Sequence, residues 1–197
     1  MIFGERVTQR CVLRSSCPEE RVAEWAEQCG WDLVAGHDPE DDMSDYERIW
    51  LTDTRLTFHY VDDPVAGIRF VFLAGSDPAT AAQYERELRE ALEPWSESDL
   101  INEVASAPTG PACARAVLRA ASGAPREPDA RFEKLIRAAL RDPDPQMRKV
   151  GILAVTYVGW RVFQTELVDL LENDSDAEVR DMCAAALRAF ERFEGKA

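Results

Sequence analysis

Apolar and polar residues alternate along several short stretches in the first half of the chain. Residues 7–14 place Val7, Cys11 and Leu13 on one face and polar side chains on the other, which is the period-two pattern of a half-buried strand. The same pattern predicts three further strands, over residues 47–53, 56–61 and 67–74. Residues 62–64 are Asp-Asp-Pro and favour a tight turn, so we expect an antiparallel meander.

Two helices are predicted in the same half, because apolar residues recur there every three or four positions. The first begins near Ser16, a suitable N-cap followed by Pro18, and ends at Gly30. The second is capped by the segment Ser76-Asp77-Pro78 and its apolar stripe runs to Leu92. The predicted order is β-α-β-β-β-α, an α+β region over residues 1–95 with its helices packed on one face of a small sheet.

The second half of the chain shows an internal repeat instead of a strand pattern. From Glu97 onward, prolines and glycines separate several helical stretches. The segment from Asp142 to Arg148 recurs 32 residues later, from Asp174 to Arg180. Each copy lies between two stretches with helical apolar spacing. The repeated unit is therefore a helix, an aspartate-rich turn and a second helix.

This unit resembles the HEAT-repeat family of α-solenoids, whose units carry a turn of the form D-x-D-x-x-V-R. The resemblance covers two units, at about residues 130–160 and 161–193, and a weaker one at 97–122 that lacks the aspartates. It implies a short all-α HEAT-like solenoid over residues 96–197, in which aspartates and arginines of neighbouring units form a ladder. The motif residues, for which we expect structural roles, are Asp142, Asp144, Arg148, Asp174, Asp176 and Arg180.

One predicted helix of the repeat region carries no charge on any face. It runs from Val150 to Trp160. A helix that is apolar all round is normally buried on all sides, so we expect the neighbouring repeats, and in part the N-terminal region, to cover it.

The chain is strongly acidic, with 37 Asp and Glu against 23 Lys and Arg and a formal net charge of −14. This balance disfavours nonspecific binding to nucleic acid or to an anionic membrane. The excess is concentrated, since residues 32–63 alone carry ten acids and two arginines. A solvated acidic loop and a contact surface for a basic partner both explain such a segment.

The number of cysteines and the hydropathy of the chain indicate the cellular compartment in which we expect the protein. The five cysteines are an odd number without C-x-x-C spacing, which favours reduced thiols over a disulfide framework. No apolar run is long enough for a membrane span, and charges interrupt the first twenty residues where a signal peptide would need an apolar core. We therefore expect a cytoplasmic protein.

Few residues have the spacing of a catalytic or metal site. His37 and His59 lie near acidic residues, but their spacing matches no metal-binding loop, and we expect His59 on the outer face of a strand. The nucleophile-elbow, phosphate-loop and dinucleotide-binding motifs do not occur. A cysteine–histidine pair stays open because its members need not be adjacent in sequence. We assign no catalytic, cofactor-binding or metal-binding residue.

Two functions remain. The first is a non-enzymatic protein-binding or adaptor module for a basic protein, one form of which is an acidic inhibitor or immunity-type protein. Its partner-binding candidates are Asp38, Glu40, Asp41, Asp42, Asp45, Tyr157 and Trp160. The second is an enzyme or enzyme subunit, such as a lyase-like HEAT protein, with a site at the junction of the two regions. Exposed carboxylates beside aromatic residues would favour binding, and a buried, perturbed cluster of titratable groups would favour catalysis.

Overall fold

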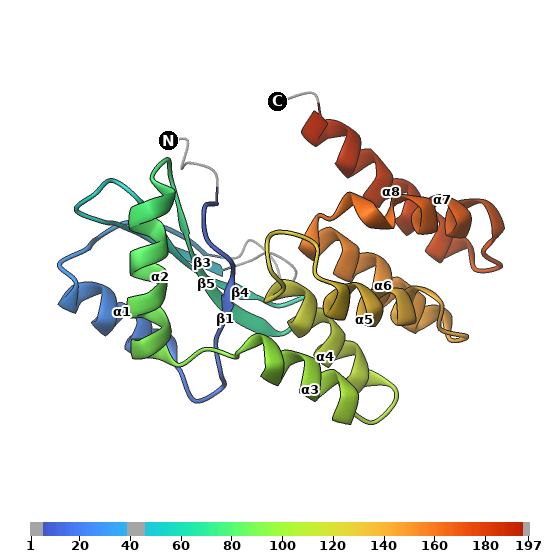
Figure 1. Cartoon of the computed structure of the whole chain (residues 1–197), viewed down its shortest axis with the longest axis horizontal. Coiled ribbons are helices and arrows are strands. Elements are labelled where there is room, and N and C mark those ends of the chain that lie inside the picture. The colour runs from blue at the N-terminus through green and yellow to red at the C-terminus, as the bar shows by residue number, and fades with distance from the viewer. Residues whose placement is uncertain (1–5, 39–45, 195–197) are drawn as a thin grey trace. The chain divides into compact units, whose positions relative to one another are not determined.

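The computed structural model describes residues 6–38 and 46–194, and the chain divides into two compact units, Met1–Ser96 and Glu97–Ala197 (Figure 1). The N-terminal unit combines a sheet with two helices, and the C-terminal unit is helical, so the chain has the predicted α+β fold with a helical C-terminal part. In the part of the chain that the structure describes, no helix has the length and apolar character needed to span a membrane.

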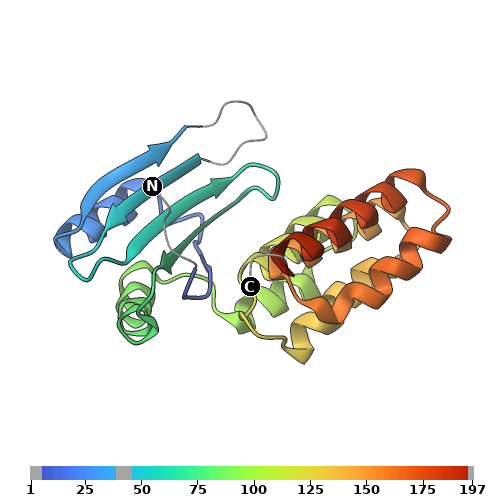
Figure 2. The same ribbon diagram turned by 90° about the horizontal axis from the view of Figure 1, so that it is seen from above.

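The N-terminal unit is built on a five-stranded antiparallel sheet. Its strands are β1 (Cys11–Val12), β2 (Asp32–His37), β3 (Tyr46–Leu51), β4 (Thr57–Asp63) and β5 (Ile68–Ala74). They lie in the order β1-β5-β4-β3-β2, so β2 forms one edge of the sheet (Figure 2). The strands β3, β4 and β5 are consecutive in the chain and adjacent in the sheet, which is the predicted meander.

The structure contains one strand more than the pattern predicts, and the order of elements is β-α-β-β-β-β-α. The additional strand is β2, which lies in the segment interpreted above as an acidic loop. Its two large apolar residues, Leu33 and Val34, are adjacent in sequence, and its pairing with β3 shifts register between Leu33 and Ala35. This bulge removes the period-two alternation by which a strand is recognised.

Helices α1 (Glu19–Gln28) and α2 (Pro78–Leu92) cover one face of the sheet (Figure 1). As predicted, the side chain of Asp77 caps α2, accepting hydrogen bonds from the backbone amides of Ala79 and Thr80. The start of α1 differs from the prediction, because Pro18 occupies the N-cap position and no side chain caps this helix. Ser16 is therefore not its N-cap.

The core between these helices and the sheet is rich in aromatic residues. The ring centroids of Trp25 and Trp31 are 5.0 Å apart, and those of Trp25 and Phe58 are 5.3 Å apart, in edge-to-face arrangements that aromatic pairs prefer. Trp50 packs on the same Phe58 ring at 5.6 Å. This cluster fixes α1 against β3 and β4, and it determines where Trp31 and Trp50 reach the surface.

The C-terminal unit consists of three helical hairpins. They are formed by α3 (Glu97–Ser106) with α4 (Pro111–Ser122), α5 (Ala130–Leu140) with α6 (Pro145–Val158), and α7 (Gln164–Asn173) with α8 (Ala177–Glu194). A short 3-10 turn, Arg161–Phe163, precedes α7. The second helices α4, α6 and α8 pack side by side (Figure 2).

The uncharged run Val150–Trp160 forms the later part of α6 and the residues that follow it, and its burial is less complete than predicted. Its buried positions include Ile152, Ala154 and Val155, whereas Leu153 is half-buried and Thr156 is exposed. Gly151 lies where α6 approaches α5 most closely, since an added Cβ would stand 2.7 Å from the backbone nitrogen of Leu140. The contacts of α6 with α4, α5 and α8 leave a narrow strip partly open.

Candidate protein-binding site

Two of the repeated aspartates act as helix caps. The carboxylate of Asp144 accepts a hydrogen bond from the backbone amide of Gln146 at 2.9 Å, at the start of α6. The carboxylate of Asp176 accepts from the amides of Glu178 and Val179 at 2.9 and 3.1 Å, at the start of α8. These bonds satisfy amides that have no partner within the helix.

Two of the other repeated residues, Arg148 and Asp174, join the second hairpin to the third. The guanidinium of Arg148 donates from Nε and Nη2 to both carboxylate oxygens of Asp174, at 2.7 and 2.8 Å. Only 12% of the Arg148 side chain and 3% of the Asp174 side chain are exposed. The hydrogen bond from Arg148 holds the pKa of Asp174 below its usual value. The ion pair uses the first aspartate of the motif, because Asp176 is occupied as a cap, and Arg180 donates instead to the backbone carbonyl of Asp174 at 2.6 Å.

The two partner-binding candidates near the end of α6, Tyr157 and Trp160, differ in their exposure to solvent. Trp160 is 3% exposed, and its indole N–H donates to the carbonyl of Arg126 at 3.0 Å. The prediction that Trp160 contacts a partner is therefore wrong, since a buried indole with a satisfied donor has no surface to offer. Tyr157 is half-buried.

The acidic segment is described only in part. Glu40, Asp41, Asp42 and Asp45 lie outside the described residues. Asp38 is exposed and accepts a hydrogen bond from Arg48 at 2.9 Å. The guanidinium of Arg48 in turn lies 4.0 Å from the centre of the Tyr46 ring, whose hydroxyl donates to Glu19 at 2.6 Å.

A shallow groove of about 530 Å³ lies in the N-terminal unit between α1 and the edge of the sheet. One wall is a helical stripe of α1, in which Glu20, Glu24 and Glu27 follow one another at spacings of four and three. The floor and the opposite wall are formed by Trp31, Asp32, Leu33 and Trp50, with Ala23 completing the lining. Leu33 is 59% exposed, the largest exposed fraction among the exposed large hydrophobic residues of the described chain.

The four acids of this groove are not neutralised by the protein. Within residues 6–38 and 46–194, the carboxylates of Glu20, Glu24, Glu27 and Asp32 form neither an ion pair nor a hydrogen bond. Their mutual repulsion is tolerated because they are exposed to water. The groove thus combines four unpaired negative charges with one exposed leucine, above a floor formed by Trp31 and Trp50, of which only 5% each is exposed.

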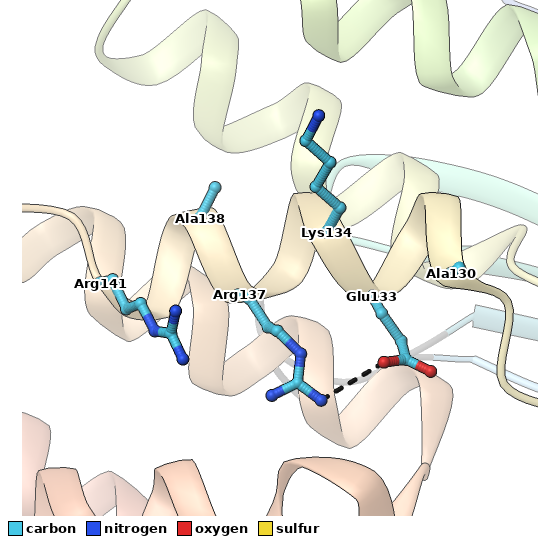
Figure 3. Close-up of a pocket in the computed structure, with 6 residues that line it drawn as sticks. All are labelled: Ala130, Glu133, Lys134, Arg137, Ala138 and Arg141. Carbon is cyan, nitrogen blue, oxygen red and sulfur yellow. Dashed lines mark hydrogen bonds and ion pairs between the residues drawn. The ribbon is translucent and has the colours of Figure 1, made fainter.

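A second groove, of about 400 Å³, lies along α5 and has a different character (Figure 3). It is lined by Ala130, Glu133, Lys134, Arg137, Ala138 and Arg141. Figure 3 shows Arg137 directed toward Glu133, and Arg137 also forms an ion pair with Glu166 of α7. Arg141 lies 3.9 Å from the same Glu166, so most of the cations of this surface have an acidic neighbour.

His59 lies on the strand β4, on the face opposite Phe58 and Tyr60 of the core, but it is buried there in a polar network. Its Nδ1 is 2.8 Å from Glu47 Oε1, its Nε2 is 2.8 Å from Thr57 Oγ1, and its ring stacks on Phe72 with centroids 4.5 Å apart. A hydroxyl, an imidazole and a carboxylate in line form the skeleton of a catalytic triad. Here the hydroxyl of Thr57 is buried and also donates to the carbonyl of Ala74, and none of the grooves described above is lined by it, so the network acts as a structural one.

Burial weakens the acidity of four of the cysteine thiols. Burial raises the pKa of Cys11 to about 12 and that of Cys183 to about 11, and it also raises the pKa of Cys17 and Cys29. A thiol with a raised pKa carries little thiolate at neutral pH. Among the described residues, no group of three or more His, Cys, Asp or Glu side chains is arranged to hold a metal ion.

Comparisons of the chain with protein-family models, with curated proteins and with solved structures found no match. The groove between α1 and β2 is therefore interpreted on its own geometry. Sequence reasoning missed it, although the helical spacing of Glu20, Glu24 and Glu27 is a local signal of one acidic face. The contribution of Leu33, Trp31 and Trp50 has no such signal, because it depends on where β2 and β3 lie beside α1.

Proposed function

We propose that this chain is a non-enzymatic protein-binding module and that its partner is a basic protein. The observation that carries the proposal is the groove between α1 and β2, where four unpaired carboxylates surround an exposed leucine and two tryptophans. Protein contacts commonly combine an apolar centre with a charged rim, and charge complementarity speeds association and selects the partner.

The helical unit serves in this proposal as a short HEAT-like solenoid. Support comes from its stacked hairpins and from the Arg148–Asp174 pair that links the second hairpin to the third. A cytoplasmic location is part of the same proposal, since all five cysteines are free thiols, as expected in a reducing compartment. An acidic inhibitor of a basic protein is the specific form that fits a groove without a reactive group.

The test is a binding measurement with a simple basic probe. A fluorescein-labelled peptide of lysine and valine is titrated with the chain, and a peptide with glutamate in place of lysine serves as the charge control. We expect the lysine peptide to bind and the glutamate peptide not to bind. Binding should weaken as the salt concentration rises from about 0.1 M to 1 M, because the screening length falls from about 10 to 3 Å.

Two double variants localise the effect. Glu24→Gln with Glu27→Gln neutralises the acidic wall, whereas Glu87→Gln with Glu90→Gln removes the same charge at the same spacing from exposed positions of α2. The first pair should raise the dissociation constant about tenfold, and the second should change it less than about twofold. Equal losses for both pairs would mean that net charge alone attracts the peptide and that the groove is not the site.

A further inference from the structure

The groove lies beside an edge strand that still offers its backbone. The strand β2 is last in the sheet and pairs only with β3, and among the described residues no other segment pairs with its outer edge (Figure 2). The opposite edge is different, because β1 has only two residues and the carbonyl of Val12 already accepts a hydrogen bond from the amide of Trp95 at 2.8 Å. An edge with free amides and carbonyls is a template for a further strand.

We propose that an extended basic segment of the partner pairs with β2 as a sixth strand and directs alternate lysine or arginine side chains over the acidic stripe of α1. This inference rests on the function proposed above and specifies how the partner binds. Side chains of an added strand alternate between the two faces of the sheet, and α1 lies on one of those faces. Every second side chain would therefore enter the groove between β2 and α1.

The dimensions of the acidic stripe agree with this alternation. Glu20 and Glu27 are seven positions apart, which corresponds to about 10 Å along a helix that rises about 1.5 Å per residue. An extended strand covers that length with about three residues, so about two alternate side chains face the stripe at once. The aliphatic part of a lysine or arginine side chain can lie on Leu33, Trp31 and Trp50 while its charged end reaches a glutamate.

Either a second copy of this chain or a segment of another protein could pair with the open edge of β2, and the charge of the groove favours the second. A second copy of this chain would bring its own β2, with Asp32 and the neighbouring glutamates, against the same acids. Like charges facing each other across a strand pair are destabilising. A basic segment meets four unpaired carboxylates instead.

Backbone methylation of the peptide tests strand addition directly. Two versions of an alternating lysine–valine peptide carry N-methyl groups, one on the odd and one on the even residues. Consecutive amides of a strand point to opposite sides, so only one version blocks the hydrogen bonds to β2. We expect that version to bind about tenfold more weakly or worse, and the other to bind like the unmodified peptide.

The outcomes separate this inference from the function on which it rests. If the unmodified peptide binds with the expected loss in the Glu24→Gln, Glu27→Gln variant, but both methylated peptides bind equally, a partner occupies the groove without adding a strand and the inference is wrong. If the unmodified peptide does not bind, the proposed function itself fails. If the chain alone dimerises in analytical ultracentrifugation and the peptide dissociates the dimer, the occupant of β2 is a second copy and the inference is overturned.

A side-chain variant provides an independent readout. Leu33→Thr keeps a residue that favours strands but removes the exposed apolar surface, and it should weaken peptide binding about threefold. Leu51→Thr is the matched control, since Leu51 is also partly exposed but lies next to Trp50 on β3 and so points to the opposite face of the sheet. Equal effects of the two variants would contradict a contact through the groove.

Discussion

Most charged side chains on α5 of the helical unit form ion pairs, whereas, among the described residues, the acids on the β2 side of α1 in the N-terminal unit do not. Arg131 contacts Asp129 and Glu97, and Arg137 contacts Glu133 and Glu166. Glu24 and Glu27 lie three positions apart on α1 and have no partner among the described residues. Paired charges are used within the fold, and unpaired ones of a single sign remain available to another molecule.

The comparison extends to the charge balance of the two halves. Residues 1–95 hold nine arginines against 20 acids, whereas residues 96–197 hold 14 basic against 17 acidic residues. Near balance allows the helical unit to form contacts such as Arg148 with Asp174. Part of the excess in the first half lines the groove beside α1, where, in the function that we propose, it would select a basic partner.

The largest effect on stability is expected from the pair that joins two hairpins. Asp174→Ala leaves the guanidinium of Arg148 without its two charged hydrogen bonds, and it should lower the free energy of unfolding by about 3 kcal/mol. The control is Glu178→Ala, which removes a pair with Lys149 in which the Glu178 side chain is 70% exposed, and it should cost less than about 1 kcal/mol. Urea unfolding of both variants measures the difference, and equal losses would show that the Arg148–Asp174 pair has no special role.

The same carboxylate should make stability depend on pH. Because Arg148 lowers the pKa of Asp174 in the folded state, its contribution is complete above the ordinary pKa of about 3.9 and is lost as the pH falls through the lower folded-state value. The stability difference between the wild type and Asp174→Asn should therefore shrink from neutral pH to about pH 3. A difference that stays constant over this range would contradict the assignment.

Removing the buried imidazole should cost somewhat less. His59→Ala leaves the carboxylate of Glu47 and the hydroxyl of Thr57 without their shared partner and removes the stack on Phe72, so a loss of about 2 kcal/mol is expected. Thermal unfolding followed by circular dichroism measures this loss. An unchanged melting temperature would mean that water replaces the imidazole at no cost.

The helix caps should have smaller and graded effects. Asp176→Ala deprives two backbone amides of their acceptor and should cost about 1 kcal/mol. Asp144→Ala deprives one amide and should cost less. Denaturant midpoints for the two variants test this order, and a reversed order would show that factors other than capping dominate at these turns.

The smallest effect on stability is expected in the groove. Glu24→Gln with Glu27→Gln removes unpaired, exposed like charges and should change the free energy of unfolding by less than about 0.5 kcal/mol. Near-constant stability together with weakened peptide binding would sharpen the distinction between the two units. A large loss of stability would instead show that these carboxylates serve the fold, and the groove would lose its functional interpretation.

Sequence reasoning succeeded where the deciding interactions are local. The cap of α2 at Asp77, the meander from β3 to β5 and the hairpins around the aspartate turns all depend on residues a few positions apart. The prediction of the N-cap of α1 was wrong for an equally local reason. Pro18 occupies the N-cap position that was expected for Ser16.

Amino-acid sequence by itself determined the division into a sheet-containing half and a helical half, the repeat at 32 residues and the concentration of acids, since periodicity and charge are properties of the chain. Tertiary structure alone decided that residues 32–37 form an edge strand, that Trp160 is buried and that His59 stacks between strands. It also decided which side chains lie next to the acids of α1. The groove brings Glu24 beside Trp50, residues far apart in the sequence, and only the packing of α1 on β3 places them together.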